Sequence, residues 1–197
     1  MPDVKISAVL LAGGESRRMG RDKAICEFRG KPLWHNQLAI LRGLKPVEVF
    51  VSARTDPVWR PNDSIFVADE RPSRGPLSGI VAALNRMRGA HLLTLAIDLP
   101  SMTAKYLQTL YDQLAGGVGV VPMIKDRAEP LAAIYPIESI DILLAALNGI
   151  DYSLQTAVRK LAETSRVRML PVSPANQELF RNLNSPDDLS STRKARR

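Results

Sequence analysis

The sequence predicts an α/β fold with a mostly parallel central sheet. Two observations lead to this prediction. Short apolar runs rich in β-branched residues alternate with helical patterns through about the first two thirds of the 197 residues. Each run is largely apolar rather than alternately apolar and polar, which is typical of strands buried on both faces of a parallel sheet. Strands and helices in this order form βαβ units, in which the helices cover the sheet.

The elements follow one another in a regular order. Strands are expected at residues 6–11, 47–53, 65–67 and 92–97. Helices are expected at residues 32–44, 76–87 and 103–115, and Pro76 suits the first position of the second helix.

After Pro122 the pattern changes. Residues 118–123 and 131–135 are expected to pair across the polar loop 124–130, which would give the sheet an antiparallel edge or hairpin. A last helix is expected to begin at residues 185–188, Ser-Pro-Asp-Asp, where a serine cap, an early proline and two acids suit a helix start.

Length and composition indicate one cytoplasmic domain spanning residues 1–197. The hydrophobic content of 45% is enough for one substantial core in a chain of this length. Cys26 is the only cysteine, so no intrachain disulfide can form, and a reducing compartment is the simplest setting. No secretory signal is recognisable, and no stretch approaches the roughly 18 apolar residues of a membrane helix.

The net charge of +7 favours anionic ligands. Part of the charge lies in a basic tail at about residues 190–197, which we expect to be mobile and solvated. Aromatic residues make up only 5% of the chain, and none alternate with basic residues as they do in single-strand binders. We therefore expect neither nucleic acid nor a membrane to be a partner.

A glycine-rich, basic loop follows the first predicted strand. Three glycines and four cations lie between Gly13 and Lys23. In open α/β sheets ligands bind beyond the carboxyl ends of the strands, where this loop must lie. Glycine lets backbone N–H groups approach a phosphate, and Arg18 and Lys23 can offset the charge of a triphosphate. The spacing is neither that of a P-loop nor G-x-G-x-x-G, so a basic surface loop remains an alternative.

The residues from Leu11 to Lys23, L-A-G-G-x-S-x-R-M-G-x-D-K, resemble the signature of the molybdenum cofactor guanylyltransferase family within the nucleotidyltransferase superfamily. Further similar motifs follow in order, and the set reaches from residue 11 to residue 189. They are Gly75-Pro76-Leu77-Ser78-Gly79, Asp98-Leu99-Pro100, Glu129-Pro130-Leu131 running on to Tyr135, and residues 182–189, N-L-N-S-P-D-D-L.

The resemblance implies a three-layer α/β/α, Rossmann-like nucleotidyltransferase fold and a Mg²⁺-dependent activity. The implied reaction transfers GMP from GTP to the phosphate of molybdopterin or the molybdenum cofactor, with release of pyrophosphate. The resemblance also implies that other cofactor-synthesis proteins or molybdoenzyme chaperones are possible partners. The sequence leaves open the molybdenum state of the acceptor, the oligomeric state and the delivery partner.

By this resemblance, Arg18, Lys23 and Asp98 are the catalytic residues, and Asp98 is also the Mg²⁺ ligand. The residues that would bind the nucleotide are Leu11, Ala12, Gly13, Gly14, Ser16, Arg18, Lys23, Asp69, Gly75, Pro76, Leu77, Gly79 and Asp98. Asn182 and Asn184 would line the acceptor side.

Asp98 follows the predicted strand 92–97 directly, so a lone carboxylate is presented at the carboxyl end of a strand. One carboxylate is sufficient for Mg²⁺, which completes its shell with water and phosphate oxygens. The alternative is that Asp98 caps the following helix, although Ser101 or Thr103 could also do so. Asp22 either orients Lys23 or is a solvated loop acid, and the individual roles of Asp69 and Glu129 stay open.

Related cytidylyltransferases read L-A-A-G where this chain has L-A-G-G at residues 11–14. The missing methyl group at Gly13 leaves more room for a purine, so guanine is favoured over cytosine. The rival interpretations are another nucleotidyltransferase, dependent on CTP or acting on a sugar phosphate, and a non-catalytic nucleotide-binding module.

Overall fold

Strand β1 (Ile6–Leu11) lies inside the main sheet, and its surroundings explain why the apolar runs do not alternate. The computed structural model describes residues 4–13, 22–69 and 73–183. All six residues of β1 are buried. Ala8 and Leu10 point into one hydrophobic core, whereas Val9 and Leu11 point into a second core on the opposite face. A strand covered on both faces is therefore largely apolar, and its one buried polar side chain, Ser7, has a hydrogen-bond partner.

The main sheet has the strand order β10-β7-β9-β6-β1-β4-β5, with the short strand β8 paired to β7. The other strands are β4 (Val49–Ala53), β5 (Ile65–Ala68), β6 (His91–Ala96), β7 (Gly119–Ile124), β8 (Arg127–Ala128), β9 (Ala132–Pro136) and β10 (Val167–Pro171). Strands β6, β1, β4 and β5 run parallel, as do β7 and β10. Only β9, among the strands of that path, runs antiparallel to its neighbours.

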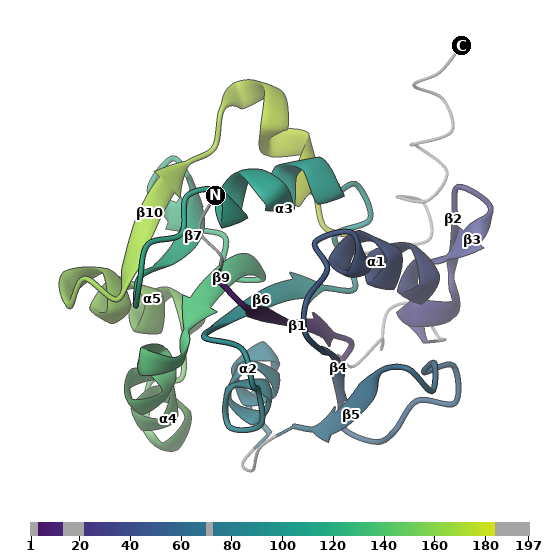
Figure 1. The fold of residues 1–197 in the computed structure, drawn as a ribbon, viewed down its shortest axis with the longest axis horizontal. Coiled ribbons are helices and arrows are strands. Elements are labelled where there is room, and N and C mark those ends of the chain that lie inside the picture. The colour runs from purple at the N-terminus through teal and green to yellow at the C-terminus, as the bar shows by residue number, and fades with distance from the viewer. Residues whose placement is uncertain (1–3, 14–21, 70–72, 184–197) are drawn as a thin grey trace.

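Helices cover both faces of the sheet and give the three-layer architecture (Figure 1). Helices α1 (Leu33–Arg42) and α3 (Ala104–Tyr111) pack into one core. Helices α2 (Pro76–Leu84), α4 (Ile140–Asn148) and α5 (Leu154–Glu163) pack into the other. The remaining elements are the hairpin strands β2 (Glu27–Phe28) and β3 (Lys31–Pro32) and the 3₁₀ helices η1 (Lys23–Ile25), η2 (Ile137–Ser139) and η3 (Pro174–Phe180).

The predicted elements are confirmed, with differences at their ends. The strand expected at residues 92–97 spans 91–96, and the helix expected at 103–115 ends at Tyr111. The antiparallel pairing is confirmed by Val120, which lies opposite Ile134. Strand β9 lies within the sheet rather than at its edge. The expected helix at 185–188 and the basic tail lie outside the described residues. The described part of the chain contains no helix with the length and apolar character of a membrane span.

A buried carboxylate joins the amino ends of three strands and should contribute to stability. Glu48, just before β4, accepts hydrogen bonds from the Ser7 hydroxyl of β1 (2.7 Å) and from the backbone N–H and Nε of Arg88 (2.5 and 2.7 Å). The Glu48 side chain is only 4% exposed. Burial alone raises the pKa of this carboxyl. The hydrogen bonds from Ser7 and Arg88, together with the charge of Arg88, lower the pKa by more than burial raises it, so the net pKa lies below 4.5.

We therefore expect Glu48→Gln to lower the free energy of unfolding at pH 7 by about 2–3 kcal/mol, because the buried hydrogen bonds to a charged acceptor are lost. The exposed Arg88 guanidinium adds little through its charge alone. The ionised carboxylate stabilises the fold above its unfolded pKa, and this contribution disappears as the pH falls through the lowered pKa. Urea unfolding at pH 7 and pH 3 tests this. An equal difference between the two proteins at both pH values would contradict it.

Candidate functional site

The carboxyl ends of the parallel strands carry the side chains that the sequence singled out. Gly13 follows β1, Asp69 follows β5 and Asp98 follows β6 closely, and β1 lies directly between β6 and β4. A cavity opens at this end of the sheet. It is lined by Leu11, Ala12, Gly13, Asp22, Lys23, Pro76, Ala96, Ile97, Asp98 and Leu131. Residues from four separate motifs therefore share one pocket.

Lys23 and Asp98 are joined through the backbone of Leu183. The Leu183 N–H donates to the carbonyl oxygen of Asp98 at 2.8 Å, and the Leu183 carbonyl accepts from Lys23 Nζ at 2.9 Å. These two bonds bring the C-terminal segment to the sheet, although Lys23 and Leu183 are 160 residues apart. Asn182, the residue before Leu183, is exposed.

Asp98 has an environment that suits a cation. Its Oδ1 is buried and has no hydrogen-bond partner among the described residues. Burial raises the pKa of this carboxyl, and the Lys23 charge and the Asp98 backbone N–H lower it only in part. The Thr103 hydroxyl caps helix α3 by accepting from the Tyr106 N–H at 3.2 Å, so Asp98 is not the cap of that helix. Burying a carboxylate oxygen without a hydrogen-bond partner costs free energy, and binding of a hard cation would offset that cost.

Lys23 is the first residue of the 3₁₀ helix η1, which Asp22 caps. Asp22 Oδ1 accepts from the Ala24 N–H at 2.9 Å, and Oδ2 accepts from Trp59 Nε1 at 2.8 Å. Both carboxylate oxygens of Asp22 thus have partners on the polypeptide. Asp22 fixes the turn from which the Lys23 side chain extends toward Leu183 and Asp98.

Asp69 is held against the glycine loop. Its Oδ1 accepts from the Ser52 hydroxyl at 2.8 Å, and its backbone N–H donates to the carbonyl of Ala53 at 3.1 Å. A Cβ atom on Gly13 would lie only 2.9 Å from Asp69 Oδ2. Glycine at this position therefore allows the close approach of the loop to the carboxylate.

Helix α2 begins at the pocket. Gly75 precedes it with φ +65°, a backbone conformation that favours glycine, and Pro76 occupies the first turn and lines the cavity. The side chain of Leu77 is buried in the core. A Cβ atom on Gly79 would lie 2.3 Å from Ser52 Oγ, so Gly79 lets the helix pack closely against the strand that holds Asp69 in place.

Leu131, in the motif from Glu129 to Tyr135, also lines the cavity. The buried Tyr135 hydroxyl donates to the Pro130 carbonyl at 2.9 Å, and the Thr94 hydroxyl donates to the same oxygen at 3.3 Å. The Ala96 N–H donates to the Leu131 carbonyl at 2.9 Å, which fixes the turn beside β6. Glu129 is half-buried, and burial raises its pKa.

Comparison with known proteins shows which family the chain belongs to. The model of the MobA-like NTP transferase domain matches residues 8–170, which is most of the chain. The chain belongs to the MobA-like NTP transferase family. It is therefore a nucleotidyltransferase.

Relatives of the transferase match it over nearly their whole length. A protein from Opitutus terrae, named a probable molybdenum cofactor guanylyltransferase, is 34% identical over 96% of this chain and 95% of its own. The molybdenum cofactor guanylyltransferase of Pseudomonas fluorescens is 32% identical over 94% of this chain and 92% of its own. Molybdopterin-guanine dinucleotide biosynthesis protein A from Archaeoglobus fulgidus is 26% identical. Its crystal structure matches with a TM-score of 0.73 over 94% of this chain and 95% of its own.

The expected site residues of the transferase fall into three groups. Leu11, Ala12, Gly13, Lys23, Pro76 and Asp98 line the cavity, Asp69 and Gly75 adjoin its lining residues, and Asn182 is an exposed neighbour of Leu183. The side chain of Leu77 and the α-carbon of Gly79 belong to the core. Gly14, Ser16, Arg18 and Asn184 lie outside the described residues.

Three contributions to the pocket were missed by sequence reasoning. Ser52 holds Asp69, Trp59 binds Asp22, and the backbone of Leu183 joins Lys23 to Asp98. Ser52 and Leu183 looked like ordinary members of a strand and a motif. Trp59 lies in an irregular loop without periodicity, and nothing local to it points to Asp22.

Proposed function

We propose that this transferase moves GMP from GTP to the phosphate of molybdopterin or the molybdenum cofactor. The names of its relatives support the nucleotide and the acceptor. The observation that carries the proposal is the unpartnered buried oxygen of Asp98, placed in one cavity with Lys23 and the end of β1. The single, buried Cys26 suits a reducing cytoplasm.

The reaction we propose is an in-line displacement at phosphorus. An oxygen of the acceptor phosphate attacks the α-phosphorus of GTP, and the bond from that phosphorus to the bridging oxygen breaks as pyrophosphate leaves. The acceptor phosphate is already an anion, so no strong general base is needed. Lys23 neutralises the charge that grows on the departing pyrophosphate, and the backbone after β1 aligns the triphosphate. Asn182 is proposed to contact the acceptor from the C-terminal segment.

The residues present fit a divalent cation, for which we propose Mg²⁺. Asp98 would hold it, because its buried oxygen lacks a partner and Mg²⁺ is commonly bound through one or two carboxylates. The described residues contain no cluster of three or more His, Cys, Asp or Glu side chains that could hold a metal ion. When bound, the cation offsets the charge of the triphosphate.

The nucleotide preference tests the proposal. With molybdopterin as acceptor, we expect kcat/KM for GTP to exceed that for CTP and for ATP by at least about tenfold, since one tenfold step requires only about 1.4 kcal/mol of differential binding. Mass spectrometry of the product identifies the transferred nucleotide. Equal use of GTP and CTP by the unmodified protein would overturn the base assignment.

Gly13→Ala should narrow this preference. The added methyl group would meet Asp69 Oδ2 at 2.9 Å, so the carboxylate or the loop must move. We expect a loss of about tenfold in kcat/KM for GTP and a smaller loss for CTP. Displacement of the loop or of the Asp69 carboxylate should reduce the productive binding of the preferred nucleotide most. Gly116→Ala is the matched control, since a Cβ there meets no atom within 4 Å. An unchanged GTP to CTP ratio in Gly13→Ala would show that Gly13 does not act on the base.

A further inference from the structure

The two tryptophans of the chain stack on one another at the edge of the pocket. The rings of Trp34, in α1, and Trp59, in the loop between β4 and β5, lie 5.7 Å apart with an interplanar angle of 16°. Trp59 Nε1 donates to Asp22 Oδ2 at 2.8 Å. The stack fixes the plane of the Trp59 ring, and the ring plane fixes the direction of its N–H. Trp59 therefore presents a donor to the residue that precedes Lys23.

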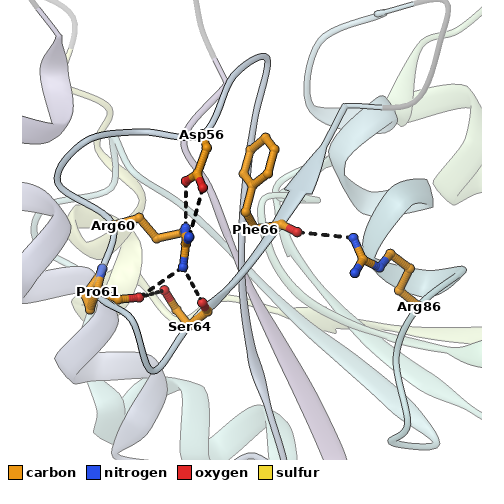
Figure 2. A network of polar contacts seen from close by, with 6 residues as sticks. All are labelled: Asp56, Arg60, Pro61, Ser64, Phe66 and Arg86. Carbon is orange, nitrogen blue, oxygen red and sulfur yellow. Dashed lines mark hydrogen bonds and ion pairs between the residues drawn. The ribbon is translucent and has the colours of Figure 1, made fainter.

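The loop that carries Trp59 has its own internal support (Figure 2). Arg60 makes two bonds to the carboxylate of Asp56, at 2.7 and 2.8 Å, and reaches the carbonyls of Pro61 and Ser64 at 3.2 and 2.5 Å. Figure 2 shows the Arg60 side chain lying between Asp56 on one side and Pro61 and Ser64 on the other. A guanidinium bonded to both limbs of a loop limits its movement. The hydrogen bonds of Arg60 therefore also restrict the position of its neighbour Trp59.

The contact continues from Asp22 to the reacting groups. One carboxylate oxygen of Asp22 accepts from Trp59, and the other accepts from the N–H of Ala24, within the 3₁₀ helix η1. Lys23 is the first residue of η1, and its Nζ reaches Leu183, whose N–H holds the Asp98 backbone. A shift of the Asp22 carboxylate would rotate this turn and move Lys23 Nζ relative to Asp98.

We propose that Trp59 is a positioning residue for Lys23, acting through Asp22. The proposal rests on the proposed function, because it assigns Lys23 to the phosphates of the nucleotide. Trp59 itself contacts no reacting group in this account. Its role is to keep the turn at Asp22 in the orientation that places Lys23 against the leaving pyrophosphate.

Trp59→Phe isolates the hydrogen bond, since phenylalanine can still stack on Trp34 but has no N–H. We expect kcat for GTP to fall about tenfold with a smaller change in KM, because the Lys23 interaction strengthens as charge develops on the leaving group. Trp34→Phe is the matched control: it alters the same stack but leaves the Trp59 N–H on Asp22, and its kcat should stay within about twofold of wild type. Thermal melting checks that each variant folds. A normal kcat in folded Trp59→Phe would overturn the proposal.

A double-mutant cycle distinguishes positioning from a general structural effect. If Trp59 acts through Lys23, then Trp59→Phe should cause no further loss in a Lys23→Met background. The same tenfold loss in both backgrounds would overturn the proposal. Asp22→Ala provides a second route should Trp59→Phe fail to fold: it should reproduce the loss in kcat, and a normal kcat in that variant would equally overturn the proposal.

Binding of inorganic pyrophosphate gives a readout that depends on neither the base nor the acceptor. By calorimetry, Lys23→Met should raise the Kd for pyrophosphate about tenfold, Trp59→Phe about threefold, and the double variant no more than Lys23→Met. If wild type binds pyrophosphate in this way but does not use GTP, the proposed function fails while the role of Trp59 stands. Independent effects of the two substitutions on the Kd would contradict the role of Trp59 and leave the proposed function untouched.

Discussion

Asp98→Asn should lower the rate of GMP transfer by about 10²-fold or more while the protein stays folded. Asparagine keeps nearly the same shape and one oxygen acceptor, but it removes the negative charge on which a hard dication depends. Binding of GTP should weaken less than turnover falls, because Lys23 and the backbone after β1 still contact the phosphates. Mg²⁺-dependent release of pyrophosphate by the two proteins measures the effect.

The same substitution should not destabilise the metal-free protein. Burial raises the pKa of Asp98, and one of its oxygens is buried without a partner, so the ionised carboxylate opposes folding when no cation is bound. We therefore expect metal-free Asp98→Asn to melt at a temperature no lower than wild type. Asp126→Asn, in an exposed turn, is the control that should change neither quantity. Near-normal turnover, or a clearly lower melting temperature, would indicate a structural role for Asp98.

Lys23→Met should reduce kcat by about 10²-fold, the usual loss when one group that stabilises transition-state charge is removed. Methionine keeps a flexible side chain of similar length, so the turn at Asp22 should persist. The pH profile should change as well. The Lys23 charge lowers the pKa of Asp98, and its removal should move the acidic limb of kcat/KM to higher pH. A limb that stays in place or moves to lower pH would contradict the coupling of these residues.

Much of the fold was predictable because β1, β4 and β6 are buried at every position. Apolar runs bounded by helix signals mark β1, β4, β5 and β6 clearly. The position of β9 between β6 and β7 was not predictable, because local patterns define strands but not which neighbours they choose. Strand β10 has only one buried residue, Val167, so its sequence gives a weak strand signal.

The candidate site residues were predictable where a residue stands out within its own sequence motif. Asp98 directly after an apolar run and Lys23 at the end of a glycine-rich loop stand out from their own surroundings. The partners of these residues did not stand out. Leu183 acts through its backbone, which any residue could supply, and Trp59 reaches Asp22 across 37 residues. Such contacts depend on how distant loops meet, and that is decided by the packed fold.

Isotopic labelling of the phosphates of GTP distinguishes attack at the α-phosphorus from attack at the γ-phosphorus. We expect label from the α-phosphate of GTP to enter the acceptor, and label from the γ-phosphate to leave as pyrophosphate. Both should depend on Asp98 and Lys23. Transfer of the γ-label to the acceptor, or its release as inorganic phosphate while the α-label remains on GDP, would show attack at the γ-phosphorus and would contradict nucleotidyl transfer at this site.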